Sequence, residues 1–336
     1  MSNEIENNNP VIVKKKYPYL FTATELLSMK QNDIPYLWKP FLVSQGIAAL
    51  VGSSDVGKTS FLRQLAIYIV LRKTQFLGHE LNVRHGRVIY FSTEDNQVSV
   101  NALLKKQIDK SINPLDLKGL CYIFNTDNPL KVIEEQLKAE KTDLVIIDAY
   151  SDIFEGNSND LGNVRRFLNK YEKLAQENDC AIIFLHHTGK RTELGSPSKN
   201  NIIGSQGFEA KMRVVWDLRK QDGSSSRFFQ ITKGNYLPES RKSKSMELLF
   251  NQKQEFEFNG QYVDKNNSLG RLKFSEDEKA AIMKEVKRMI DSKHPYDKIL
   301  EELPKLGFKK VPSKGTLSNW LNDDDENDVH SDEIVE

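Results

Sequence analysis

Gly52-Ser53-Ser54-Asp55-Val56-Gly57-Lys58-Thr59 matches the pattern G-x-x-x-x-G-K-[ST], which is typical of a phosphate-binding loop. Apolar residues 46–51 before it predict a short buried strand, and residues 60–68 after it predict a helix. Such a loop surrounds phosphates with backbone N–H groups, so Gly52 and Gly57 stand where a side chain would collide. A chance Gly-Lys-Thr turn would lack these flanking elements. The stretch therefore predicts an α/β fold built around a nucleoside triphosphate site.

Each part of this loop has an expected role. Residues from Gly52 to Ser60 are expected to bind the nucleotide through backbone N–H groups, helped by the positive end of the following helix. The Lys58 side chain is expected to reach the phosphates, and the Thr59 hydroxyl to ligate Mg²⁺. ATP and Mg²⁺ are therefore the expected cofactors.

Composition narrows the class of protein. The chain has 336 residues, is 38% hydrophobic and carries a formal net charge of +1, which gives no global argument for nucleic-acid or membrane binding. Cys121 and Cys180, the only cysteines, lie in apolar runs and suggest buried thiols in a reducing compartment. No charged-then-apolar leader opens the sequence, and no apolar run approaches the ~18 residues of a membrane helix. We expect a soluble, cytoplasmic protein with no membrane partner.

Strand and helix patterns alternate along the middle of the chain. Continuous apolar strands separated by helices favour a mainly parallel sheet with helices on both faces. Three later runs with hairpin-like spacing favour an antiparallel extension of that sheet. The expected strands are residues 46–51, 86–92, 120–124, 143–148, 181–185, 214–218, 228–231 and 247–250, and the expected helices are residues 23–27, 60–68, 100–108, 132–139 and 161–177.

Composition shifts mark the ends of this α/β domain, which is expected to span residues 17–263. Residues 1–16 are polar and Asn-rich and are expected to be disordered. The turn-rich residues 264–272 are typical of a linker. Residues 273–322 have a helical pattern, with predicted helices at about 275–290, 296–306 and 313–321. Residues 323–336 contain eight acids and no Lys or Arg, which predicts a solvated, disordered tail.

Two carboxylates follow buried strands. Asp148 ends the most apolar strand of the chain, about 90 residues after the phosphate loop, and this position suits an acid that holds the Mg²⁺ shell. Glu94 also ends a strand, where a carboxylate could polarise the attacking water. An equally good interpretation from these residues alone is that Thr93-Glu94-Asp95 caps the next helix.

His186 and His187 end a later strand. A histidine pair of this kind is usually structural or faces solvent. Beside the phosphates, however, one of the two imidazoles could hydrogen-bond to the γ-phosphate and report its presence.

These motifs resemble RecA-fold ATPases of the RepA-type hexameric plasmid helicase family, which is related to DnaB-like helicases. The resemblance covers about residues 20–240. Within it, residues 86–95 resemble the family strand whose Glu is the catalytic carboxylate, which implies that role for Glu94. Residues 184–190 resemble the family's His-His-x-x-Lys sensor, which implies His186, His187 and Lys190, with His187 the better γ-phosphate contact.

The same resemblance implies a residue that acts between subunits. Gly204-Ser205 followed by Arg213 resembles the family segment with an arginine finger, and Lys211 with Arg213 resembles the Lys-x-Arg pair of related rings. Such residues reach ATP bound to the neighbouring subunit, so the resemblance implies a homo-oligomeric ring, with a hexamer as the form of the family. The resemblance assigns catalysis to Lys58, Glu94, His187 and Arg213.

The C-terminal helices resemble a helix-turn-helix, whose last helix enters a DNA groove. This resemblance makes DNA a candidate partner. A helical bundle for protein contacts or ring assembly is an equal alternative, since the acidic tail would repel phosphates. The residues expected to contact DNA are Lys309, Lys310, Lys314, Thr316, Ser318 and Asn319.

Three functions are compatible with these features. The first is a ring-forming, Mg²⁺-dependent ATPase that translocates along or unwinds DNA during replication of a plasmid, phage or other mobile element, with a possible replication partner protein. The second is an ATP-switched protein that assembles on DNA or on a partner without unwinding. The third is a small-molecule kinase, which would need neither Arg213 nor a separate helical module.

Overall fold

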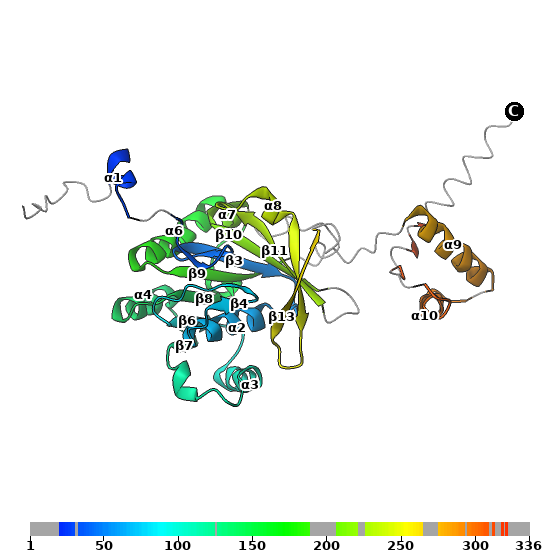
Figure 1. The fold of residues 1–336 in the computed structure, drawn as a ribbon, viewed down its shortest axis with the longest axis horizontal. Helices are drawn as coiled ribbons and strands as arrows, with labels where there is room; N and C mark the ends of the chain where they lie inside the picture. The colour runs from blue at the N-terminus through cyan, green and yellow to red at the C-terminus, as the bar shows by residue number, and fades with distance from the viewer. Residues whose placement is uncertain are drawn as a thin grey trace, which may run out of the picture. The chain divides into compact units, whose positions relative to one another are not determined.

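A mixed β-sheet forms the centre of the computed structural model (Figure 1). The structure describes residues 20–30, 33–124, 126–188, 206–220, 226–264, 275–292, 294–308, 311–312, 317–318 and 320–321. Within these residues, nine strands form the sheet in the order β13-β12-β11-β10-β3-β9-β8-β6-β7. The chain divides into two compact units, one ending at Pro35 and the other beginning at Tyr36.

The sheet has a parallel part and an antiparallel part. Strands β10, β3, β9, β8, β6 and β7 pair in parallel, and β11, β12 and β13 extend the sheet antiparallel from β10. The strands are β3 (Gly46–Gly52), β6 (Val88–Ser92), β7 (Leu120–Phe124), β8 (Leu144–Asp148), β9 (Ala181–His187), β10 (Val214–Lys220), β11 (Ser226–Gly234), β12 (Lys244–Phe250) and β13 (Phe256–Asp264). The predicted α/β class with an antiparallel extension is confirmed.

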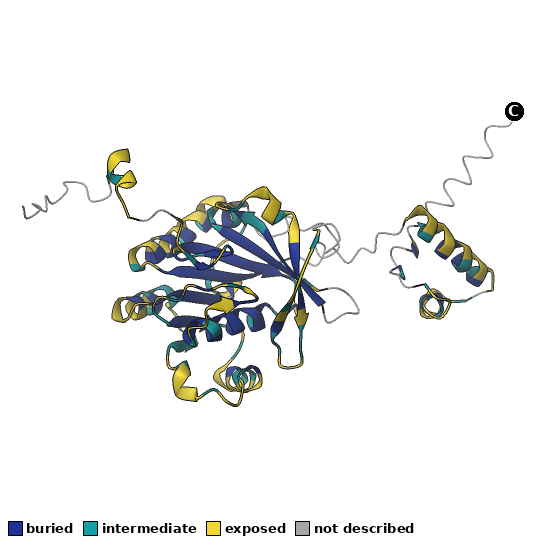
Figure 2. Ribbon diagram, viewed as in Figure 1, coloured by how far each residue is buried: buried dark blue, intermediate teal, exposed yellow. Residues whose placement is uncertain are grey.

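Helices cover both faces of the parallel strands, which are buried as Figure 2 shows. One face packs against α2, and the other against α4, α5, α6 and α7. This two-sided burial explains why β3, β8 and β9 are apolar up to their carboxyl ends, where Asp148, His186 and His187 stand. The helices are α2 (Lys58–Val70), α3 (Gln97–Gln107), α4 (Pro129–Ala139), α5 (Tyr150–Ile153), α6 (Leu161–Asn178), α7 (Gln206–Lys211) and α8 (Glu239–Lys242), with the 3-10 helix η1 (Pro114–Leu117).

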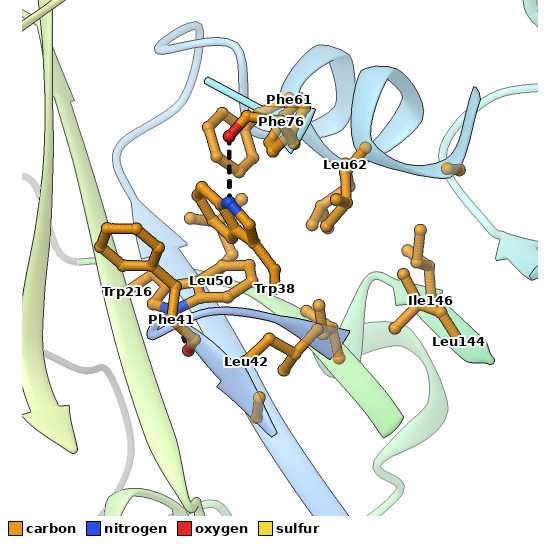
Figure 3. Packing of buried hydrophobic residues seen from close by; sticks show 14 of the residues in the cluster. Trp38, Phe41, Leu42, Leu50, Phe61, Leu62, Phe76, Leu144, Ile146 and Trp216 are labelled. Carbon is orange, nitrogen blue, oxygen red and sulfur yellow. Dashed lines mark hydrogen bonds between the residues drawn. The ribbon is translucent and has the colours of Figure 1, made fainter. Parts of the chain in front are cut away.

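An aromatic cluster anchors two short hairpins to the α2 face. The hairpins are β1 (Tyr36–Trp38) with β2 (Leu42–Val43), and β4 (Gln75–Phe76) with β5 (His79–Glu80). Trp38 is fully buried, and its indole Nε1 donates to the Phe76 carbonyl at 3.0 Å (Figure 3). Its ring lies 5.5 Å from that of Trp216 on β10. The hairpins thus close the apolar side of α2.

The C-terminal helices have their own apolar cluster. Helix α9 (Glu276–Asp291) begins at the predicted capping box of Ser275 and Glu278, and α10 (Tyr296–Glu302) follows it. Predicted as residues 296–306, this second helix ends earlier, at Glu302. Buried side chains of α9 and α10 pack with Leu317. The expected disordered residues 1–16 and the expected acidic tail 323–336 lie outside the described residues. So does the expected linker 264–272, except for Asp264, which ends β13.

Two expectations need adjustment. No strand was expected at Phe256–Asp264, because most of these residues are exposed and give no apolar run. Strand β13 nevertheless forms there by pairing with β12. Cys180 is buried as expected, whereas Cys121 is only half-buried near the sheet edge. At the N-terminus, α1 (Ala23–Leu27) has the predicted bounds. None of the described helices combines the length and the apolar character that crossing a bilayer requires.

Candidate active site

Three of the four expected catalytic residues, Lys58, Glu94 and His187, meet at one edge of the sheet. Parallel strands end together there, with Gly52 paired with His187 and Ser92 paired with Asp148. A cavity of about 600 Å³, a size that suits a nucleotide, opens at this edge. Its lining residues are Ser54, Asp55, Gly57, Lys58, Thr59, Ser60, Glu94, Leu185 and His187.

The two glycines of the loop are required by space. A Cβ on Gly52 would lie 2.4 Å from the Leu218 carbonyl oxygen, and one on Gly57 would lie 2.9 Å from a ring atom of Phe256. Gly57 also has φ +96°, a left-handed conformation that side chains rarely adopt. The predicted reason for glycine at both positions is therefore confirmed.

Lys58 lies at the centre of the cavity. Its Nζ donates to the carbonyl oxygens of Gly52 at 3.0 Å and Ser53 at 2.6 Å. Burial lowers the pKa of Lys58 to about 8, and the charges of Glu94, Asp148 and other acids only partly oppose this shift. A desolvated ammonium group that is held by neutral carbonyls is well placed to transfer its hydrogen bonds to an anion.

Asp148 and Thr59 fit a magnesium site. Burial raises the pKa of Asp148 to about 6, while the neighbouring hydroxyls of Tyr90 and Thr59 act in the opposite direction. Oδ2 of Asp148 accepts a hydrogen bond from Tyr90 at 2.7 Å. Oδ1 is buried and makes no hydrogen bond to any described residue. A carboxylate oxygen left unsatisfied beside a hydroxyl at the phosphate loop is a suitable ligand set for Mg²⁺ and its waters.

Glu94 is linked to Lys58 through His187. Nε2 of His187 lies 3.0 Å from Oε1 of Glu94, and Nδ1 lies 3.4 Å from Nζ of Lys58. An ammonium group only donates, so Nδ1 accepts and the ring proton resides on Nε2, which donates to Glu94. Glu94 is half-exposed at the cavity and does not cap α3, because the N-cap of that helix is Asn96. The capping alternative is therefore wrong for Glu94.

The other two residues of the expected sensor differ from His187. His186 is buried, and its ring lies 5.0 Å from that of Tyr150 and 4.9 Å from that of Phe208. This environment gives His186 a packing role and leaves His187 alone at the cavity. Lys190 lies outside the described residues, as do Gly204 and Ser205.

Arg213 lies far from the phosphate loop of its own chain. Its N–H donates to the Ile47 carbonyl, at the beginning of β3, whereas the loop follows Gly52 at the end of that strand. Five residue steps of strand separate Ile47 from Gly52, a distance of about 17 Å. The guanidinium donates to Glu172 Oε1 at 2.9 Å. Lys211 ends α7 on the same side. The structure therefore does not bring Arg213 or Lys211 to the cavity.

One of the six residues expected to contact DNA lies within the described part of the chain. Lys309, Lys310, Lys314, Thr316 and Asn319 lie outside the described residues. Ser318 is described, and its side chain is exposed in a short helical segment after the buried Leu317.

Two site residues were missed in the sequence. Tyr90 holds Asp148, as described above, and Thr93 Oγ1 donates to the Asp148 carbonyl at 2.9 Å while accepting from Ala149 N–H at 3.0 Å. Thr93 thereby joins the ends of β6 and β8. A threonine directly before a strand-end glutamate was a possible signal, but Tyr90 is indistinguishable from an apolar strand residue.

Comparisons with known proteins agree with this geometry. A family model described as "AAA domain" matches residues 16–193, more than half of the chain. The ATPase domain of G40P, a solved structure, is similar with a TM-score of 0.50 at 14% identity, over 64% of this chain and 84% of that one. At this identity the likeness shows the fold, which is RecA-like. Comparison of the sequence with curated proteins gives no match.

Proposed function

This chain belongs to the AAA domain family, and from that premise we propose that it is an Mg²⁺-dependent ATP hydrolase. One observation carries the proposal. The buried ammonium of Lys58, the half-exposed carboxylate of Glu94 and the loop glycine Gly57 all face one cavity of nucleotide size. Phosphoryl transfer to water needs a cation at the phosphates, a backbone that surrounds them and a group that positions the attacking water, and these residues supply the three.

Each residue at the cavity has a distinct role in the proposed hydrolysis. Lys58 exchanges its bonds to the loop carbonyls for bonds to the phosphates, and the loop N–H groups complete the cradle. Thr59 and Asp148 would hold Mg²⁺, which when bound neutralises charge on the phosphate oxygens. Glu94 orients and polarises the attacking water, once His187 turns from the carboxylate towards the γ-phosphate. This turn would couple occupancy of the γ-phosphate position to the release of Glu94.

The finer part of the proposal concerns assembly and DNA. We propose a homo-oligomeric ring of hexamer type, in which Arg213 reaches ATP on the neighbouring subunit. Arg213 lies beside the start of β3, away from the phosphate loop at the end of that strand, and is therefore too far from the nucleotide of its own chain. Such a ring would act on DNA, as a translocase or helicase, in replication of a plasmid, phage or other mobile element. The C-terminal helices and a replication protein are candidates for contacts with DNA and partner.

A second candidate is an ATP-switched assembly protein that does not unwind DNA. The observation that favours it is the ion pair of Arg213 with Glu172, a side chain only 10% exposed, which holds the proposed finger within its own subunit. In this case, ATP would stabilise an assembled state without driving motion.

The test measures ATPase rate with and without single-stranded DNA, together with particle mass with and without ATP and strand displacement on a forked duplex. A hydrolase is expected in both cases. DNA-stimulated hydrolysis by a ring that displaces the strand supports the motor. ATP-dependent assembly without displacement supports the switch. No hydrolysis under any condition contradicts the proposed function.

A further inference from the structure

Arg227 is a buried arginine that contacts the phosphate loop from the antiparallel extension. It lies near the start of β11 and is 6% exposed. Its Nε donates to the carbonyl oxygen of Val56 at 3.2 Å, and its Nη1 donates to the Ser226 carbonyl at 3.1 Å. Burying a guanidinium group costs free energy unless its N–H groups are hydrogen-bonded.

The bond to Val56 orients the next N–H group. The Val56–Gly57 peptide is trans, so its C=O and N–H point in opposite directions. With the Val56 oxygen held towards β11 by Arg227, the Gly57 N–H points away from β11. Gly57 lines the cavity, and a donor directed into it is what the phosphates require.

We propose that Arg227 is a positioning residue of the phosphate loop, and that its hydrogen bond to Val56 fixes the Gly57 N–H in the orientation that binds phosphate. This inference rests on the proposed function and assigns a role to the antiparallel extension within it. Arg227 does not touch the nucleotide, so its effect passes through the loop backbone.

Neighbouring aromatic residues hold this arrangement in place. The Arg227 guanidinium carbon lies 5.2 Å from the centre of the Phe250 ring, a cation–π geometry that restricts its motion. The rings of Phe250 and Phe256 also close on Gly57, since an added Cβ there would lie 3.4 Å and 2.9 Å from them. Side chains of β11, β12 and β13 thus pack against the Val56–Gly57 part of the loop.

The test compares full-length wild-type protein with Arg227→Met. Loss of a hydrogen bond from a charged donor is expected to weaken binding about 10- to 100-fold. The factor should be the same for Mg²⁺–ATP, Mg²⁺–ADP and inorganic tripolyphosphate, because all three use the loop N–H groups. Without the ordered loop, KM for ATP should rise far more than kcat falls. Arg227→Lys, which keeps a charged donor, should bind more tightly than Arg227→Met.

Gln230→Met is the matched control, because it also removes a buried hydrogen bond on β11, from Gln230 to the Lys242 carbonyl at 3.3 Å. It should lower the melting temperature and leave nucleotide affinity unchanged. Should Arg227→Met not fold, Arg227→Gln takes its place.

Wild-type affinity in whichever Arg227 variant folds would overturn the inference, as would an equal loss of affinity in Gln230→Met. Failure of the wild-type chain to bind ATP would contradict the proposed function itself, and this inference with it. Wild-type binding with an insensitive Arg227 variant would contradict this inference alone.

Discussion

Nε2 of His187 lies 3.0 Å from Oε1 of Glu94, although 93 residues separate them in the sequence. The contact engages the proposed catalytic carboxylate, and the other ring nitrogen of His187 faces Lys58 at 3.4 Å. A group that contacts both the phosphate-binding lysine and the water-activating carboxylate can couple the state of one to the other.

Glu94→Gln should bind ATP as tightly as the wild type and hydrolyse it at least about 100-fold more slowly, because an amide cannot polarise water as a carboxylate does. The amide oxygen still accepts from His187, so the contact itself survives. Nucleotide titration and single-turnover hydrolysis provide the measurement. Reduced affinity with normal turnover would mean that Glu94 has a structural role.

Affinity for ATP should depend on pH through Lys58, whose pKa burial lowers to about 8. Below that pH the ammonium is charged and affinity should be flat. Above it, binding must take up a proton, so Kd should rise about tenfold per pH unit. Lys58→Arg stays charged throughout and serves as the control. The same slope in both proteins would exclude Lys58 as the titrating group.

Asp148→Asn should lose Mg²⁺-dependent hydrolysis while gaining stability at pH 7. Burial raises the folded pKa of Asp148 to about 6 from a usual 3.8, so ionised Asp148 destabilises the fold, and stability falls as pH rises through that window. Tyr90 can still donate to the amide oxygen. Thermal melts at pH 7 and pH 4 should show a gain that shrinks at the lower pH. A lower melting temperature at pH 7 would contradict this account.

Arg213→Ala should bind ATP almost normally and hydrolyse it about 10³–10⁵-fold more slowly if the arginine stabilises charge on a neighbour's nucleotide. Mixed with Lys58→Ala, it should regain partial activity, because some interfaces then pair an intact loop with an intact arginine. The control is Glu172→Gln, which removes the ion pair within the subunit and keeps Arg213. Full activity of Arg213→Ala alone, or turnover independent of protein concentration, would exclude a trans-acting finger.

Deletion of residues 323–336 should leave ATP hydrolysis unchanged, because the tail follows residues 17–263, the proposed span of the nucleotide domain, in the sequence. If the C-terminal helices bind DNA, removal of eight acids should tighten that binding at low salt, and the gain should shrink as salt screens both partners. Fluorescence anisotropy with labelled DNA at two salt concentrations measures both effects. Equal affinity at low salt would favour a protein partner for the module.

Much of the fold could be predicted because its signals are local. The apolar run 144–147 predicts a buried strand, which β8 forms, and Ser275 with Glu278 marks a helix start through contacts three residues apart. Strand β13 escaped prediction because only Phe256 and Phe258 pack against the core, so most of the strand is exposed and gives no apolar run. Among the described strands, β13 pairs with β12. Its existence depends on a neighbour and not on its own pattern.

Spacing and residue type were enough to predict the phosphate loop, the strand-end carboxylate Asp148 and the α/β class, because the backbone does the chemistry at such a loop. That His187 and not His186 faces the cavity became clear from the folded sheet, since side chains of adjacent strand residues point to opposite faces. The tertiary fold also separated Arg213 from the loop and brought Arg227 to Val56, because strand pairing, not distance along the chain, sets which residues meet.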